Sequence, residues 1–326
     1  MGARMARGSE QDIVGRRLMD SHTKAHRRRA PLETLSLTDW RQLRAELVWV
    51  YDGRIAPKFL RQSNYTPGQT AYLIRRGTVY IQTERGEVTV GSGNWVFPHE
   101  GKRIQEFSSD ARILSIRFYW TWPGGQPVFD WDVARVMPAK SIRVLETAAK
   151  RLVQFTERHF PGATLHLVGE QSDLETQLLL NRRFLDWLGV YARILLRTGE
   201  TPLRLGPIDP RLLQAIQVLD QHPFAAPFRE RDLASRLGLS VSQLDRLFVR
   251  QFKISPWAYL EKRKIREAVD RVQGTVDPIK QIAIDFGFST LAHFSSWFRN
   301  HISLSPRQLR QNRMSRFQVE TLSHLE

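Results

Sequence analysis

Residues 232–240 read Asp232-Leu233-Ala234-Ser235-Arg236-Leu237-Gly238-Leu239-Ser240, and residues 281–289 read Gln281-Ile282-Ala283-Ile284-Asp285-Phe286-Gly287-Phe288-Ser289. Both stretches place an apolar residue, alanine, glycine, a second apolar residue and serine at the same relative positions, at an offset of 49 residues. One additional residue then enters the second copy, so that Ser255-Pro256 matches Ser305-Pro306 at an offset of 50. Internal repetition of this length indicates a duplicated supersecondary unit.

Each copy has the pattern of a helix-turn-helix. Ala234 and Ala283 are small residues where two helices would cross closely. Gly238 and Gly287 stand where the first helix ends, a place where the backbone commonly needs a positive φ. The second helix of each copy is expected to show one apolar face, made of Leu244, Leu247 and Phe248 in the first copy and of Phe294, Trp297 and Phe298 in the second.

Capping residues mark the ends of the expected helices. Ser240 and Ser289 are suited to N-cap the second helix of each copy. Further helices are expected where a capping residue precedes a proline, at Asp209-Pro210, Ser255-Pro256, Asp277-Pro278 and Ser305-Pro306. A helix of about 18 residues, from Pro256 to Gln273, then separates the copies, so two reading helices can enter successive major grooves roughly 34 Å apart.

With these features, residues 209–313 resemble the AraC/XylS family of bacterial transcription regulators. The resemblance implies two helix-turn-helix subdomains joined by a helix, and an N-terminal cupin-like barrel followed by helices that dimerise. It also implies sequence-specific binding to double-stranded DNA, and contact with RNA polymerase if the protein is an activator. The residues that carry it are Leu233-Ala234, Gly238-Leu239-Ser240, Leu244, Arg246-Leu247-Phe248, Pro256, Tyr259-Leu260, Arg263, Ala268, Ile282-Ala283, Gly287-Phe288-Ser289, Phe294, Phe298, Pro306 and Arg310.

The polar side of the second helix in copy one supplies the main candidate DNA contacts. In the family, the positions that match Ser242, Gln243, Asp245 and Arg246 reach the major groove, and Arg250 lies on the same side. Arg246 is the strongest candidate for a base contact, because arginine bonds guanine bidentately. Gln243 would bond a base edge or a phosphate. Asp245 would repel phosphate, so it either accepts from cytosine or orients Arg246.

Copy two is poorer in hydrogen-bond donors. Ser296 stands where the family often has arginine, so weaker or more indirect readout is expected from this half. Arg299, Lys262, Arg263 and Lys280 are expected to contact phosphates, and such contacts position the protein rather than specify the sequence. A solvated charged face is the alternative for some of them. The candidate DNA contacts of copy two are Leu291, Ala292, His293, Ser295, Ser296 and Arg299.

Two glycines that are common in the family before the Ser/Thr-Pro step are replaced here. Lys253 occupies this position in copy one and Ser303 in copy two. We expect these helix ends to be looser or differently capped, without a change of fold.

The region 36–135 has the short apolar runs and tight turns of an antiparallel sandwich or small barrel. Expected strands include 47–51, 71–74, 78–81, 87–90, 94–97 and 113–119. Residues 136–198 then change to a helical period, and their apolar helix is expected to pack against the barrel or against a second copy of itself. The family resemblance implies that this region dimerises, so a homodimer is expected. The fold class is therefore α+β multidomain: a cupin-like β-barrel with packing helices, then an all-α DNA-binding domain. A basic disordered arm (1–35), a Gly/Pro-rich linker (199–208) and a C-terminal tail (314–326) complete the chain.

The barrel is expected to hold a small-molecule effector. The arginines of the barrel are expected either to attract an anionic effector or to be solvated. The aromatic side chains on its strands are expected either to line a pocket or to belong to the core. His99 and Glu100 make a poor metal site, because neighbours on a strand point to opposite faces. No metal, no cofactor and no enzymatic activity are therefore expected. The candidate effector-binding residues are Tyr72, Arg75, Tyr80, Trp95 and His99.

Three functions fit these features. The first is an effector-responsive regulator, and the second is a constitutive regulator whose barrel serves only oligomerisation or protein interaction. The third is a cupin metal enzyme fused to a DNA module, which the missing histidine cluster disfavours.

The composition agrees with a DNA-binding protein. The 49 Lys+Arg against 33 Asp+Glu give a formal charge of +16, which favours polyanionic partners. The chain has no cysteine, so disulfides and cysteine nucleophiles are excluded. No apolar run approaches the length of a membrane span and no signal-peptide pattern is present, so a cytoplasmic location without membrane contact is expected.

Overall fold

The computed structural model describes residues 37–161, 163, 166–167, 169–203 and 208–311. These residues belong to one compact unit that begins at Leu37. The predicted basic arm, the end of the linker and the C-terminal tail lie outside the described residues.

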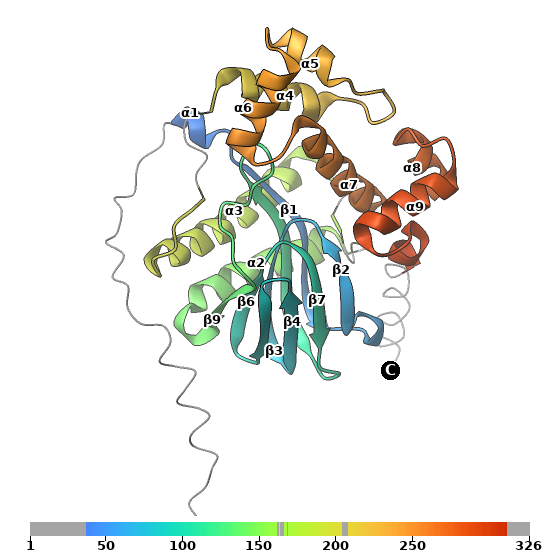
Figure 1. Ribbon diagram of the computed structural model, residues 1–326. Helices are drawn as coiled ribbons and strands as arrows, with labels where there is room; N and C mark the ends of the chain where they lie inside the picture. The colour runs from blue at the N-terminus through green and yellow to red at the C-terminus, as the bar shows by residue number, and fades with distance from the viewer. Residues whose placement is uncertain (1–36, 162, 164–165, 168, 204–207, 312–326) are drawn as a thin grey trace, which may run out of the picture. The chain divides into compact units, whose positions relative to one another are not determined.

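The first part of the described chain forms two antiparallel sheets (Figure 1). One sheet has the strand order β1-β8-β3-β6-β9 and the other β2-β7-β4-β5. Antiparallel β structure is therefore confirmed, but the strands form two open sheets instead of the closed barrel that was expected. A short helix, α1 (Leu37–Trp40), precedes the strands: β1 (Arg44–Arg54), β2 (Arg61–Thr66), β3 (Gln69–Arg76), β4 (Thr78–Thr83), β5 (Gly86–Gly91), β6 (Asn94–Pro98), β7 (Gly101–Phe107), β8 (Arg112–Thr121) and β9 (Ala134–Pro138).

The two sheets share an apolar core. Tyr72 of β3 meets Phe107 of β7 edge-to-face, with ring centres 5.6 Å apart. The buried side chains around them come from both sheets, because alternate residues of each strand point inward. These side chains include Ile74, Val79, Ile81, Val90, Val96 and Ile113.

The other face of the five-stranded sheet is covered by helices α2 (Arg143–His159) and α3 (Leu174–Arg197). Phe97 stacks on Tyr191 of α3 with ring centres 4.5 Å apart, and Phe118 meets Trp187 at 5.1 Å. Within the region 136–198, α2 and α3 are helical, whereas residues 136–138 belong to β9. Helix α3 turns one apolar side to the sheet.

Strand β7 was missed by the apolar pattern because two of its inward residues are polar. Arg103 and Gln105 are both buried. Arg103 donates to the carbonyl of His99 at 3.2 Å and to Gln105 at 3.3 Å. Internal hydrogen bonds therefore satisfy side chains that a sequence pattern reads as solvent-facing.

The second part of the chain contains the duplicated helical units. Each has its own apolar core, which matches the predicted repeat. The first core includes Leu233, Leu244 and Phe248, and the second includes Ile282, Phe294 and Phe298. The helices are α4 (Pro210–Gln221), α5 (Glu230–Arg236), α6 (Val241–Phe252), α7 (Pro256–Gly274), α8 (Ile279–Asp285) and α9 (Leu291–Ile302).

Most of the predicted helix caps are present. Ser240 forms a capping box: its hydroxyl accepts from the backbone N–H of Gln243 at 3.2 Å, and Gln243 Oε1 accepts from the backbone N–H of Ser240 at 2.9 Å. In copy two the cap is Thr290 instead of Ser289, because the additional residue moves the start of α9 by one position. The prediction for Asp277 was also wrong: α8 begins after Pro278, and Asp277 pairs with Arg271 instead.

Lys253 and Ser303 end α6 and α9 in the left-handed conformation, with φ of 59° and 66°. Their backbone N–H groups donate to the carbonyls of Val249 and Arg299. The helices therefore end in the way that a glycine would allow, although non-glycine residues occupy these positions.

Candidate nucleic-acid interface

Helix α6 presents a polar face to solvent, as predicted from copy one. Leu244 and Phe248 are fully buried beneath the helix. Ser242, Arg246 and Arg250 are exposed. Two arginines one turn apart on a short, capped helix can contact base edges and phosphates of one groove.

Gln243 is exposed, but its amide is partly occupied. Its Oε1 atom accepts from the Ser240 backbone in the capping box. The amide NH₂ group is then the part of Gln243 that can donate to DNA. Sequence reasoning missed this restriction, although the spacing of serine and glutamine contains its signal.

Asp245 turns away from the exposed face. It is half-buried, and its Oδ1 atom is buried with no hydrogen-bond partner among the described residues. Glu230, at the start of α5, has a raised pKa, first because of burial and then because of the charge of Asp245. The negative charge of Asp245 therefore acts on Glu230 within the first unit.

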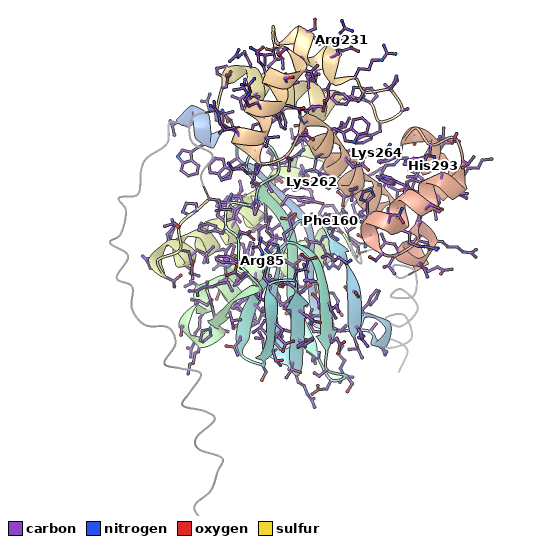
Figure 2. All side chains as sticks on the ribbon, viewed as in Figure 1. Arg85, Phe160, Arg231, Lys262, Lys264 and His293 are labelled. Atoms are coloured by element: carbon purple, nitrogen blue, oxygen red, sulfur yellow. The ribbon has the colours of Figure 1, made fainter. Side chains whose placement is uncertain are left out.

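Helix α9 presents the corresponding face of copy two. Leu291 is 43% exposed, and Ala292, His293, Ser296 and Arg299 are also exposed, whereas Ser295 is half-buried. His293 is labelled in Figure 2. Beneath this face, the ammonium of Lys264 lies 4.3 Å from the centre of the Phe288 ring. Arg299 is thus the one cation among the predicted contacts of α9.

Arg263 does not have the free guanidinium of a phosphate contact. Its Nη1 atom donates to the carbonyls of Leu219 at 2.8 Å and His222 at 2.7 Å. Its Nε atom donates to Glu267 at 3.0 Å. The residue therefore acts within the helical domain, and the exposed cations of the predicted phosphate set are Lys262, Lys280 and Arg299.

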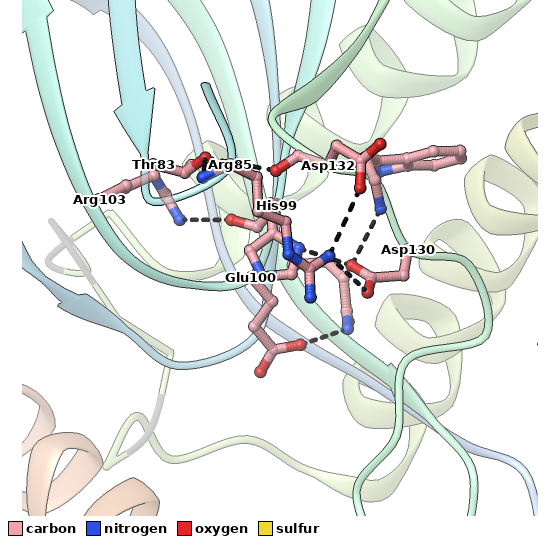
Figure 3. Close-up of polar contacts among 9 residues, drawn as sticks. Thr83, Arg85, His99, Glu100, Arg103, Asp130 and Asp132 are labelled. Atoms are coloured by element: carbon pink, nitrogen blue, oxygen red, sulfur yellow. Dashed lines mark hydrogen bonds and ion pairs between the residues drawn. The ribbon is translucent and has the colours of Figure 1, made fainter. Parts of the chain in front are cut away.

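The five candidate effector residues are not brought together in one cavity. Tyr72 is buried and donates to Gln105 at 3.2 Å, and Trp95 is fully buried against Phe97. Arg75 pairs with Asp52 and Glu146 at 2.6 and 3.0 Å, and Tyr80 donates to Glu87 at 2.5 Å. His99 holds Asp130 at 2.6 Å, beside Arg85 (Figure 3). Of the five, only His99 lines the large cavity described next.

That cavity has a volume of about 800 Å³ and is lined by β-region loops together with α4 and α7. Tyr119 lines it, and its buried hydroxyl has no hydrogen-bond partner among the described residues. The guanidinium of Arg266 lies 5.1 Å from the centre of the Tyr119 ring. Lys262, labelled in Figure 2, lines the cavity from the same helix as Arg266. The size is that of a small-molecule site.

The carboxylates that line this cavity are engaged by protein groups. Glu100 accepts from Gly68 at 2.9 Å and from Gln69 at 2.7 Å, and burial raises its pKa. Asp130 is held by His99, and Asp220 accepts from Tyr259 at 2.6 Å. The cations and the Tyr119 hydroxyl are therefore the groups left to attract a ligand.

Helix α7 also contacts the first part of the chain directly, at β8 and at the segment between α2 and α3. His166 Nε2 lies 2.9 Å from Asp270 Oδ1, and Arg117 donates to Gln273 at 3.2 Å. Both partners lie on the helix that joins the two helix-turn-helix units. A ligand bound in the cavity would thus lie next to α7, the helix between the two helix-turn-helix units.

Within the described part of the chain, no group of three or more histidine or acidic side chains is placed to hold a metal ion. None of the helices described is both long and apolar enough to cross a membrane.

Comparison with known proteins identifies relatives of this chain. The domain family described as "Helix-turn-helix domain" matches residues 233–312. The transcriptional regulator ArgR of Pseudomonas aeruginosa is 27% identical over 194 residues, which cover 60% of this chain and 54% of that protein. The transcriptional activator RhaS of Klebsiella pneumoniae is 28% identical, covering 45% and 53%. The chain thus spans about half the length of the curated relatives it matches.

Two solved structures are also similar. Fatty-acid-bound ToxT from Vibrio cholerae is 12% identical with a TM-score of 0.45, covering 82% of this chain and 94% of that one. An AraC-type regulator from Chromobacterium violaceum is 34% identical with a TM-score of 0.29, covering 32% and 92%. The functional comparison therefore comes from the sequence relatives.

Proposed function

The chain carries the double helix-turn-helix domain of the AraC/XylS transcription regulators, and we propose that it is a sequence-specific regulator in which α6 reads bases and α9 clamps the adjacent groove. The observation that carries this proposal is the pair of exposed faces on α6 and α9. Each face sits on a capped helix above its own core, and α7 separates them. Arg246 and Arg250 give α6 the donors that α9 largely lacks.

Replacing Arg246 with alanine is expected to weaken binding to the preferred sequence by about 10- to 100-fold, because a bidentate arginine–guanine contact discriminates by roughly 1–3 kcal/mol. The preference is expected to disappear at one or two base pairs, with affinity for unrelated DNA nearly unchanged. Selection from random DNA, followed by titration at fixed salt, measures both. Arg236→Ala, an exposed arginine on α5, is the control. Unchanged site selection by Arg246→Ala would refute its role.

We propose that the protein acts as a homodimer through the exposed side of α3. Leu174, Leu178 and Leu185 are 75%, 59% and 53% exposed, and Leu196 continues the same side. Their spacing of 4, 7 and 11 residues places them on one helical stripe. Gly189 lies on this stripe with open space beside it, which permits close approach of a second α3. A second copy of the chain offers the same apolar surface in return.

We propose that the cavity beside Tyr119 holds the effector, in place of the interior of the β region. The unpartnered hydroxyl and the cations of α7 favour a small anionic molecule. Such a molecule would contact the helix that spaces α6 and α9. A bound effector shifts DNA affinity only if it binds one state of the protein more tightly than the other.

A panel of small carboxylates and phosphate esters is expected to contain a compound that changes DNA affinity of the wild-type chain by at least about fivefold, the lower end of typical coupling. The Lys262→Ala variant is expected to lose this response, because one of the cavity's cations is removed. Lys280→Ala, an exposed lysine on α8, is the control for charge alone. A DNA affinity that no compound alters favours the alternative, a constitutive regulator whose β region serves only association.

A further inference from the structure

Phe224 connects the two helix-turn-helix units at a point away from α7. It lies in the loop between α4 and α5, within the first unit. Among the described residues, it is the side chain that packs against both apolar cores. Its ring stacks on Phe286, at the end of α8, with centres 4.9 Å apart and planes 11° from parallel. The loop therefore reaches across to the second unit.

Cations flank this stacked pair. The guanidinium of Arg263 lies 4.2 Å from the centre of the Phe224 ring, and that of Arg271 lies 6.0 Å from the Phe286 ring. Arg263 also bonds the carbonyls of Leu219 and His222, which lead into the loop. Arg271 bonds Asp277 and Asp285 at 2.8 and 2.7 Å, on either side of α8. Each ring is thus fixed by an arginine of α7.

The loop backbone also contacts the second unit closely. A Cβ atom added to Gly287 would lie 2.8 Å from the carbonyl oxygen of Phe224 and 2.9 Å from Ala225 Cα. The equivalent glycine of the first unit, Gly238, has nothing within 4 Å of its added Cβ. The two copies therefore differ at the same position. The loop packs closely on the turn of the second unit, whereas the turn of the first unit has open space beside its glycine.

We propose that Phe224 is a positioning residue that fixes the distance and rotation between α6 and α9. Helix α7 already holds the second unit, because Val269 and Val272 pack in the second core and Arg271 bonds Asp285. The Phe224–Phe286 contact adds a second point of attachment, and two separated attachments restrict rotation. The inference rests on the proposed DNA-reading function for its consequence: the two groove segments must then occur at one spacing.

The arrangement can be tested without DNA. The chain has no cysteine, so Ser235→Cys on α5 and Lys280→Cys on α8 allow two spin labels to be placed at exposed sites of the two units. A narrow distance distribution is expected for the labelled wild-type chain. Phe224→Ala is expected to broaden it, and Phe224→Tyr, which keeps the ring, to restore it. An unchanged distribution in Phe224→Ala would overturn the proposal.

Phe228→Ala is the matched control. Phe228 lies in the same loop and is also half-buried, but it packs on the first core and on Trp257, with ring centres 5.8 Å apart. It is expected to leave the distance distribution narrow. Broadening by both variants would mean a generally loosened loop and would count against a specific role for Phe224. If Phe224→Ala fails to fold by circular dichroism, Phe224→Leu replaces it, because leucine keeps apolar bulk but cannot stack.

The consequence for DNA is tested on the sequence that the wild-type chain selects. Inserting two base pairs between the groove segments rotates one by roughly 70°, since about 10.5 pairs make a turn. The wild type is expected to lose about 10- to 100-fold in affinity, the value of one reader's base contact. The same insertion is expected to cost Phe224→Ala less affinity: the logarithm of its fold-loss is expected to be less than half that of the wild type. An equal loss in both overturns the inference, whereas a wild type without sequence preference overturns the proposed function and leaves the spin-label result standing.

Discussion

Replacing Gly287 with alanine is expected to destabilise the DNA-binding domain by about 2–5 kcal/mol. The backbone there has a φ of +78°, where an L-residue costs roughly 1–2 kcal/mol. The added Cβ would also meet backbone atoms of Phe224 and Ala225 at under 3 Å, so the loop has to move. Displacing packed groups typically costs a further 1–3 kcal/mol or so.

Gly238→Ala separates these two effects. Gly238 has a φ of +64° and no atom within 4 Å of its added Cβ, so only the backbone strain applies. Its expected cost is about 1–2 kcal/mol. Urea unfolding of both variants gives the free energies, and the difference between them measures the contact of the loop with the second unit. Equal destabilisation of the two variants would show that the loop moves away at no cost.

Replacing Leu185 with aspartate is expected to convert the dimer to a monomer and to weaken binding to a two-site operator by about 10²- to 10⁴-fold. A charged group in the middle of the α3 stripe would be buried without a partner in the dimer. Two linked DNA-binding domains gain affinity of this order from their effective concentration, and a monomer loses that gain. Sedimentation equilibrium and operator titration measure the two effects.

Val144→Asp is the control for this variant. Val144 is 62% exposed, but it lies on α2 and outside the stripe. It is expected to leave both mass and affinity unchanged. If Leu185→Asp still sediments as a dimer, the dimer interface does not lie at the α3 stripe. If the wild-type chain sediments as a monomer, the homodimer itself is refuted.

The helical domain was predictable in detail because its signals are redundant. Each unit repeats an alanine, a glycine and a cap in the same order, and the structure places Ala234, Ala283, Gly238 and Gly287 as this order requires. The errors were local. The cap of α9 moved to Thr290 because one inserted residue shifts the helix start, which an offset alone does not locate.

The β region was less predictable because its inward positions are not all apolar. Buried Arg103 and Gln105 concealed β7, and closure of a barrel depends on strand pairing that no single strand encodes. The candidate DNA-binding site could also be predicted only in part. Helical periodicity placed Arg246 on the exposed side, but it could not show that the Oδ1 atom of Asp245 is buried, since that burial depends on neighbouring elements.

The cavity was not predictable from the sequence. It is formed where Tyr119 comes near Lys262 and Arg266, more than 140 residues later in the chain. Of the aromatic residues proposed to line a pocket, Tyr72 and Trp95 are buried in the β region, whereas Tyr80 is half-buried and bonds Glu87. Composition identifies such residues equally well as core or as pocket, and only the tertiary contacts separate the two.

The difference between the turns at Gly238 and Gly287 gives the domain a polarity. Among the described residues, the loop lies close to the turn of the second unit, whereas nothing lies near the added Cβ of Gly238, so the two units are not interchangeable although their sequences repeat. If α6 and α9 read DNA as proposed, one protomer has a fixed direction on its part of the target, with the arginine-bearing helix at one end. Reversing the order of the two groove segments, with their spacing kept, is then expected to weaken recognition by that protomer.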